Sequence, residues 1–303
     1  MALPAHQTGD RAPAGILIMC LGVVCLCAND ALAKALGETY PPVQILFIRN
    51  LIALPIAAAI ALVMGGPQAL VSRSPMVHLG RGLIWMAAAY LFFTGLTLLE
   101  LAEATTLIFA APAIICALSA LVLKEQVGWR RWSAVLVGFG GVLIVVQPGT
   151  DAFQTAALYP LATAFLYALM MISSRWLDAR ESVWTLTLYL VGSGALISAV
   201  LVPFFWVPIR AEDLWLFAGI AAAGTVGATL ITQAFRIAPA AVVAPFDYTS
   251  LIWAVLLGYV LWGEVPDHAT YLGASVIVAS GLYIVYREWL HSRSTKAVSR
   301  LQG

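Results

Sequence analysis

Charged residues in this chain are so widely spaced that the segments between them are expected to be membrane-spanning helices. Uncharged runs of suitable length follow one another from residue 12 to residue 286, and a helix needs about 20 apolar residues to cross a bilayer. The run over 237–263 is interrupted only by Asp247. Charged residues make up 10% of the chain, against about 25% in soluble domains, so most of the protein surface is expected to face lipid.

The runs predict an all-α membrane protein with ten transmembrane helices. Connectors such as 65–67 and 147–149 carry Gly and Pro, which favour turns. The first run also resembles a signal peptide that ends at Ala31-Leu32-Ala33, but cleavage there would leave nine spans, and we interpret it as a helix. The predicted helices are 14–36, 43–64, 77–99, 103–123, 129–146, 153–175, 183–203, 214–235, 240–262 and 268–286.

Lys and Arg residues predict the orientation of these helices. Thirteen of them fall on the side of the N-terminus, and three, Lys34, Arg49 and Arg210, fall toward the other side. Cytoplasmic loops carry the excess of positive charge, so we predict a multi-pass protein of a bacterial inner membrane with both termini in the cytoplasm. The net charge of +1 does not indicate binding to nucleic acid. The expected partners are a small-molecule solute and the lipid bilayer. We expect the chain to be a monomer or a weak dimer.

The two halves of the sequence repeat each other. Segment 118–127 parallels 256–265, and 133–146 parallels 273–286; Glu264 follows Glu125 by 139 residues, and Gly281 follows Gly141 by 140 residues. Each half holds five predicted helices, an odd number, so the second must enter the membrane upside down. Inverted repeats are typical of secondary transporters that work by alternating access. The predicted organisation is a first repeat at 1–149, a second at 150–290, and a cytoplasmic tail at 291–303.

The same residues carry a family resemblance. The pattern of an apolar run, a glutamate and a glycine-spaced helix, found twice, resembles the EamA repeat of the drug/metabolite transporter superfamily. The resemblance implies a central cavity formed mainly by helices 1, 3, 4, 6, 8 and 9, and a substrate among amino acids, nucleobase-containing metabolites, vitamins or drugs. Within the family the chain looks most like bacterial amino-acid exporters of the YddG type; relatives with similar Phe-Asp-Tyr segments carry riboflavin or S-adenosylmethionine. The matching segments are Lys34, 48–50, Glu125 with 131–132, 244–250 and 257–266.

Asp247 is the acid that most needs an explanation, because a carboxylate inside a membrane must face protein, water or a partner. As a continuous helix, the segment would place Asp247 and Ser250 on one face with Ala254 and Gly258. Phe246 and Tyr248 flank the acid, and this wall is predicted to bind a substrate amine or a proton. The alternative is a structural carboxylate paired with a tyrosine or with Arg236. Pro245 here and Pro112 in the fourth helix each remove a backbone hydrogen bond, which marks either a binding region or a packing kink.

Other charged residues are expected to act in gating or structure. Asp30 and Lys34 have the i, i+4 spacing of an ion pair, and Arg49 approaches from the same side, so the three are predicted to form one cluster. Glu125 and Glu264 end the fourth and ninth helices and are interpreted as loop anchors. Polar and aromatic stripes on other helices suit a cavity for amphipathic solutes, although such stripes also serve helix packing; the candidate substrate contacts there are Met86, Tyr90, Thr94, Tyr167 and Gln233.

Competing functions find less support in the sequence. The histidines are scattered without an HExxH motif, and no Ser–His dyad or nucleotide-binding P-loop is present. The cysteines lie in apolar runs without a histidine at metal-ligand spacing. We therefore expect neither enzymatic activity nor a metal or cofactor, while a channel or a membrane-embedded assembly factor remains an alternative. The favoured interpretation is export of amino acids, with riboflavin or S-adenosylmethionine uptake as the alternative; substrate, direction and coupling stay open.

Overall fold

The computed structural model describes residues 12–122, 128–150, 154–173, 181–238 and 240–301. Within these ranges all regular structure is helical. Nine membrane-length apolar spans, some of them joined across a short break, occur in the described residues, and the shorter apolar segment Trp132–Val146 supplies a tenth. The ten-helix prediction is confirmed.

The helices of the two halves follow one another in the same order. The first half contains α1 (Ala12–Gly37), α2 (Pro42–Gly65), α3 (Pro75–Leu98), α4 (Leu101–Ile108), α5 (Ala111–Val122) and α6 (Trp129–Val146). The second half contains α7 (Leu158–Ser173), α8 (Val183–Leu201), α9 (Leu214–Ile237), α10 (Ala240–Val243), the 3-10 segment η6 (Ala244–Thr249), α11 (Ser250–Trp262) and α12 (His268–Leu301). In each half the fourth span is therefore assembled from shorter pieces.

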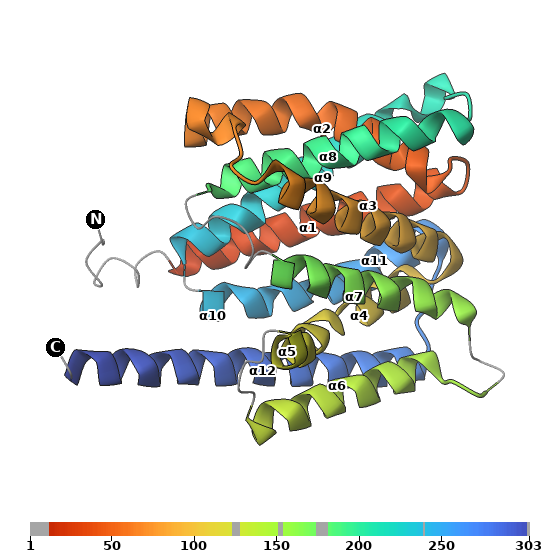
Figure 1. Cartoon of the computed structure of the whole chain (residues 1–303). Helices are drawn as coiled ribbons and strands as arrows, with labels where there is room; N and C mark the ends of the chain where they lie inside the picture. The colour runs from red at the N-terminus through yellow and green to blue at the C-terminus, as the bar shows by residue number, and fades with distance from the viewer. Residues whose placement is uncertain (1–11, 123–127, 151–153, 174–180, 239, 302–303) are drawn as a thin grey trace.

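Helices pack in pairs that each join one half to the other. α1 packs on α9, α3 on α7, α2 on α8, α4 on α11, and α6 on α12 (Figure 1). Exchanging the halves converts the α1–α9 pair into the α3–α7 pair and leaves the other three pairs unchanged. This two-fold pattern is what inverted repeats produce. The helices run side by side, and α1 begins and α12 ends on the same face of the bundle, here called the chain-end face; the other is the far face (Figure 1).

Glycines permit the closest of these helix contacts. A Cβ atom on Gly22 of α1 would lie 3.2 Å from the carbonyl oxygen of Gly227 in α9, and one on Gly227 would lie 3.0 Å from that of Gly22. Gly141 in α6 and Gly273 in α12 have the same reciprocal relation, at 3.0 and 2.7 Å. Small residues let helix backbones approach each other in membranes, where van der Waals packing drives association. The glycine-spaced helices of the repeat are therefore packing surfaces.

Both spans predicted to be irregular are interrupted. The fourth span breaks at Phe109 and Ala110 between α4 and α5, so that Pro112 lies in the first turn of α5, where a missing N–H is tolerated. The ninth span passes through η6, which contains Pro245. The segment from Asp247 to Gly258 is therefore not one continuous α-helix: Asp247 lies in η6, whereas Ser250, Ala254 and Gly258 lie in α11.

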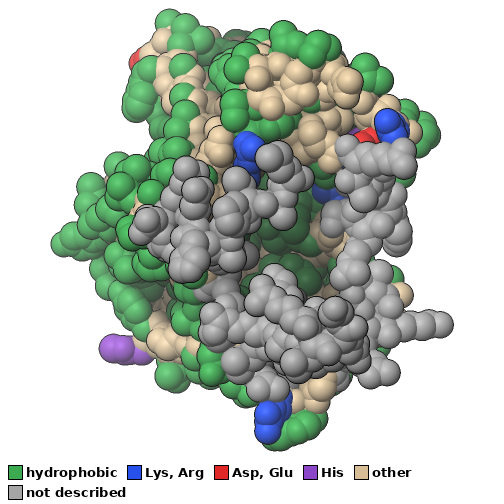
Figure 2. All heavy atoms as spheres, turned by 90° about the vertical axis from the view of Figure 1, so that its left-hand side faces the viewer, with side chains coloured by type: hydrophobic (Ala, Val, Ile, Leu, Met, Phe, Trp, Pro, Cys, Tyr) green, Lys and Arg blue, Asp and Glu red, His purple; other side chains and the backbone are tan. Residues whose placement is uncertain are grey.

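The last helix is longer than the sequence analysis predicted. α12 continues to Leu301, whereas its apolar span ends at Tyr286, so part of the predicted 291–303 tail is helical. Charged residues end the stretch that lipid can cover, but they do not end a helix. Large apolar side chains such as Leu17, Val63 and Phe204 are exposed, and apolar side chains make up much of the described surface at the chain-end face (Figure 2).

Candidate substrate site

The two interrupted spans meet each other inside the bundle. The Phe109 ring, at the break between α4 and α5, packs on the Tyr248 ring of η6 with centroids 4.7 Å apart. The Tyr248 hydroxyl lies so close to Gly281 of α12 that a Cβ atom there would be only 1.7 Å from it. Neither Pro-containing segment is therefore a kink on the lipid surface; both border the same interior region.

Asp247 lies in this region without a bonded partner in the described part of the chain. Its side chain is partly buried, and it lies within electrostatic range of the Tyr167 and Tyr248 hydroxyls and of the Cys27 thiol. Arg236, the cation suggested as its structural partner, instead stacks over Trp184 at 5.3 Å. The geometry leaves the carboxylate available to a ligand.

A second carboxylate approaches the same thiol from α1. The Cys27 thiol donates a hydrogen bond to the Ser250 carbonyl oxygen, with Sγ and O 3.6 Å apart, and Asp30 also lies within its electrostatic range. Asp30 accepts a hydrogen bond of 3.0 Å from Asn29 Nδ2 and feels the charge of Arg49. Two acids thus lie near the thiol at the η6–α11 junction, and one of them, Asp30, also interacts with Arg49.

Lys34 does not join this cluster, contrary to the prediction. Its ammonium forms an ion pair with Glu264, donates to the Leu99 carbonyl oxygen at 2.7 Å, and lies 5.2 Å from the centre of the Trp262 ring. Glu264 also accepts the Leu101 backbone N–H at 2.9 Å, at the first residue of α4. The i, i+4 rule considers one helix alone, and here a carboxylate 230 residues away has the better geometry.

The remaining predicted residues occupy varied environments. Met86 is buried in the main core with 5% of its surface exposed, whereas Tyr90 is 41% and Tyr167 36% exposed. Thr94 donates to the Tyr90 carbonyl oxygen at 2.8 Å. Gln233 and Phe246 are partly buried. Phe246 packs against a small apolar cluster that includes Met19 and Val23 of α1 and Ala234 of α9. The Ser250 hydroxyl is buried without a hydrogen-bond partner. Glu125 lies outside the described residues.

Phe109 is a site residue that the sequence analysis missed. At the 139-residue spacing that relates Glu125 to Glu264, Phe109 corresponds to Tyr248, so the two rings in contact occupy equivalent positions in the repeats. That spacing was the signal that could have identified it. The convergence of Asn29 with Arg49 at Gly224 carries no comparable sequence signal.

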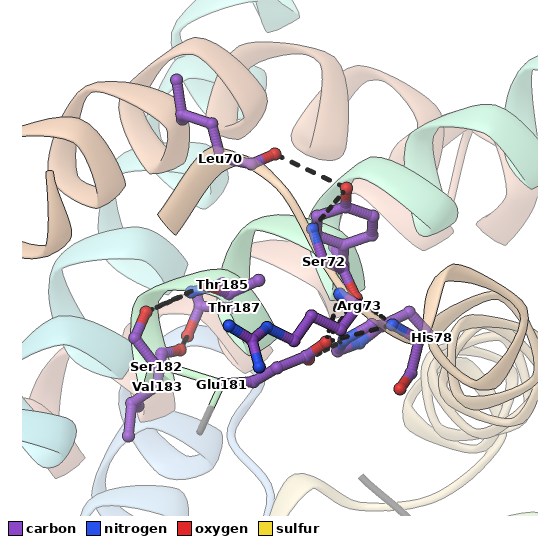
Figure 3. A network of polar contacts seen from close by, with 11 residues as sticks. Leu70, Ser72, Arg73, His78, Glu181, Ser182, Val183, Thr185 and Thr187 are labelled. Carbon is purple, nitrogen blue, oxygen red and sulfur yellow. Dashed lines mark hydrogen bonds and ion pairs between the residues drawn. The ribbon is translucent and has the colours of Figure 1, made fainter. Parts of the chain in front are cut away.

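A separate polar network joins the halves at the chain-end face (Figure 3). Glu181, just before α8, accepts hydrogen bonds from Ser72 Oγ at 2.6 Å and from the Arg73 N–H at 2.7 Å. Its other oxygen lies 2.5 Å from Nε2 of His78 on α3. Burial acts to raise the pKa of Glu181, but the hydrogen bonds from Ser72, His78 and Arg73 together outweigh it, and the pKa lies below its ordinary value.

Sequence comparison assigns the family. The profile of the EamA-like transporter family matches this chain twice, at residues 13–147 and 154–287. The chain belongs to the EamA-like transporter family. It is therefore a membrane transporter of small molecules built from two repeats, and each EamA repeat contributes one of the interrupted spans that meet at Phe109 and Tyr248.

Named relatives of this EamA protein carry different solutes. It is 28% identical over 278 residues to the "S-adenosylmethionine uptake transporter" of Rickettsia prowazekii (strain Madrid E), covering 90% of this chain and 93% of that protein. It is 32% identical over 234 residues to the "Riboflavin transporter" of Rhizobium johnstonii, covering 75% and 76%. A "Pseudopaline exporter" of Pseudomonas aeruginosa is 28% identical over 280 residues, covering 89% and 95%. None of these three is named an amino-acid exporter. They therefore favour the alternative function, uptake of riboflavin or S-adenosylmethionine, over amino-acid export.

One solved structure shares the fold of this chain. A crystal structure with 21% sequence identity superposes with a TM-score of 0.61, covering 90% of this chain and 97% of that one. At this identity the likeness concerns the fold alone.

Proposed function

We propose that this protein carries a small organic cation with an aromatic group, and that S-adenosylmethionine is its substrate. The observation that supports this most is the pair of carboxylates, Asp30 and Asp247, which lie within electrostatic range of one thiol inside membrane-spanning segments. Ionised groups there are costly unless a partner offsets their charge. Arg49 can offset one of them, and a cationic substrate would offset the other.

The aromatic residues support the same substrate class. The Phe109 and Tyr248 rings, which pack against each other with an interplanar angle of 38°, and the Tyr167 ring lie near Asp247. Aromatic faces attract cations and stack on flat heterocycles. S-adenosylmethionine has a sulfonium cation, an adenine ring and an α-amino acid group, whereas riboflavin has a flat ring but no fixed positive charge. The charge pattern therefore favours S-adenosylmethionine over riboflavin.

Acidic residues on the far face would favour the approach of a cation. Burial, together with the nearby carboxylates of Glu264 and Asp267, raises the pKa of Glu100. Clustered charge of one sign raises the local concentration of oppositely charged solutes. The acids of this face are Glu38, Glu100, Glu103, Glu212, Asp213, Glu264 and Asp267, against Lys34 and Arg210 among the described residues.

Transport by the purified protein in liposomes tests the proposal. Labelled S-adenosylmethionine should enter faster than in empty vesicles, and unlabelled S-adenosylmethionine should compete better than S-adenosylhomocysteine, which lacks the sulfonium charge. Flux of riboflavin or of free amino acids, without flux of S-adenosylmethionine, would overturn the proposal in favour of those solutes.

The variant Asp247→Asn tests the carboxylate. Asn keeps the shape and hydrogen-bonding capacity of the side chain but removes its charge. We expect flux of S-adenosylmethionine to fall at least tenfold with little change in melting temperature, because Asp247 has no bonded partner to strand. A large fall in melting temperature would assign Asp247 a structural role instead.

A further inference from the structure

Arg49 is a partly buried cation without a bonded partner among the described residues. It lies on α2, two turns from the far face, and forms no ion pair or hydrogen bond among the described residues. Asp30 acts on it only through longer-range electrostatics. Charged residues inside a membrane protein mark substrate pathways more often than packing, so the surroundings of this guanidinium are informative.

A pocket of about 130 Å³ leads to Arg49 between α2, α3, α8 and α9. Trp184 and Thr232 lie at the end toward the chain-end face, and Arg49 and Gly224 lie at the inner end. Trp85, Thr225 and Thr229 line the walls between them. This volume is below the range of about 300–1,000 Å³ typical of sites that hold whole drug-sized ligands, so the pocket suits a short polar group.

Asn29 of α1 reaches the same inner end. Its side chain is 4% exposed, and its Oδ1 atom has no hydrogen-bond partner. A Cβ atom on Gly224 would lie 2.7 Å from Asn29 Oδ1 and 3.1 Å from both Nε and Nη2 of Arg49. The glycine therefore leaves the space in which the amide oxygen and the guanidinium converge.

The polar groups at this point form a complementary set. Arg49 offers donors in a planar fork that suits a carboxylate. The Asn29 amide oxygen and the Asp30 carboxylate, which are joined through Asn29 Nδ2, offer acceptors that suit an ammonium group. A lone anion would be repelled by Asp30, and a lone cation would be repelled by Arg49. A group that carries both charges on one carbon satisfies all three residues.

We propose that Asn29, Asp30 and Arg49 bind the α-amino acid group of the substrate. Its carboxylate pairs with Arg49, and its ammonium group lies between Asn29 Oδ1 and Asp30. This inference rests on the proposed function, which supplies the substrate. It gives a binding site to the α-amino acid group of S-adenosylmethionine, the part of the molecule that Asp247 and the aromatic rings do not bind. The sulfonium and adenine groups then extend toward η6.

A matched pair of ligands tests the carboxylate contact. Decarboxylated S-adenosylmethionine keeps the sulfonium, amine and adenosine groups and lacks only the carboxylate. In Arg49→Gln, the apparent Kd for S-adenosylmethionine, measured by thermal stabilisation of the purified protein, should rise at least tenfold. The Kd for the decarboxylated ligand should change less than threefold. An equal loss for both ligands, or none for either, would overturn the inference.

Crowding at Gly224 provides a second variant. Gly224→Ala should weaken binding of S-adenosylmethionine more than that of its decarboxylated form, because the added methyl group would press on both Asn29 and Arg49. Gly80→Ala is the control, since no atom lies within 4 Å of a Cβ atom on that α3 glycine. If Arg49→Gln fails to fold, the same comparison of ligands in Gly224→Ala decides the question.

Methionine and its decarboxylated amine separate this inference from the proposed function. If the wild-type protein fails to carry S-adenosylmethionine but methionine stabilises it and the amine does not, the proposed function fails and the amino-acid subsite stands. If neither S-adenosylmethionine nor methionine stabilises the wild-type protein, the inference is overturned.

Discussion

Two carboxylates tie the halves of the protein together at opposite faces, and they do so in different ways. At the far face, Glu264 holds one ammonium group and the first N–H of α4. At the chain-end face, Glu181 receives hydrogen bonds from a hydroxyl, backbone N–H groups and an imidazole (Figure 3). The side chain of Glu264 is 17% exposed, whereas that of Glu181 is 3% exposed.

The helices that each network joins explain this difference. Lys34 and Glu264 connect α1 to spans that are broken, since α4 begins and α11 ends at the network. Glu181 connects α8 to α3 and the segment before it, and these are unbroken spans. Interrupted spans border the binding region in carriers, and access to that region alternates by rocking or gating of the repeats around it. We therefore expect the Lys34–Glu264 pair to act as a gate, and the Glu181 network to act as a fixed connection.

The largest effect is expected from breaking the gate. Glu264→Gln leaves the Lys34 ammonium without its counter-charge, and loss of one member of a buried pair typically costs about 3–5 kcal/mol. Both side chains are mostly buried, at 9% and 17% exposed. A fall in melting temperature and loss of solute flux in liposomes should follow.

The double variant Lys34→Met with Glu264→Leu separates gating from stability. Replacing both members by apolar residues is often neutral for folding, so the melting temperature should largely recover. Flux should stay low if the ion pair must break and re-form during transport. Recovery of both properties would show that the pair is only structural.

Glu181→Gln should have a smaller effect, confined to stability. Hydrogen bonds to a charged group contribute about 1.5–3 kcal/mol each, and Gln still accepts from Ser72 or Arg73, so we expect a loss of about 2 kcal/mol. Flux per folded molecule should change less than twofold. The control is Glu212→Gln, because the Glu212 side chain is 72% exposed and exposed pairs contribute little. A tenfold loss of flux in Glu181→Gln would make the chain-end network a second gate.

The contacts that distinguish the two networks could not have been predicted from the sequence. The spans, their inverted order and the breaks near Pro112 and Pro245 follow from apolar length, the repeat and proline chemistry, and the structure shows all three. Each of those signals is local or periodic. The Lys34–Glu264 contact joins residues 230 positions apart, and the His78–Glu181 contact joins residues 103 apart, so no local rule predicts either.

The same distinction applies to the residues of the candidate site: local sequence features identify some of them, and only the packing of the helices identifies the others. Asp247 and Tyr248 were found because a charge in an apolar run and a proline stand out in any sequence. Asn29 and Gly224 were missed because an amide or a glycine in a membrane helix is ordinary there. Only the packing of α1, α2 and α9 brings them together.

Acid should weaken the Glu181 connection by a modest amount. Its pKa is lowered in the folded state, so the unfolded chain binds more protons near the ordinary value, and stability rises with pH there. The stabilisation is complete above the ordinary value of 4.5 and is lost as the pH falls through the lowered value. The difference in melting temperature between wild type and Glu181→Gln should shrink as the pH falls below about 4.5. A difference that does not shrink would mean that charge plays no part in this network.

The smallest effects are expected from a pair of aromatic substitutions, one at each network. Trp262→Phe removes the exposed hydrogen bond of 3.0 Å from Nε1 to Glu38 and weakens the ring beneath Lys34, because Trp is the strongest cation–π partner. Tyr189→Phe removes the hydroxyl that accepts the Ser72 N–H at 3.1 Å and keeps the ring beside His78. Each should change the free energy of unfolding by about 1 kcal/mol or less, so both proteins stay folded for flux measurements. Because only the far-face network is expected to open, Trp262→Phe should change flux two- to threefold, and Tyr189→Phe should leave it unchanged. The reverse result would move the gate to the chain-end face, where the Glu181 hydrogen bonds would then have to break in every transport cycle.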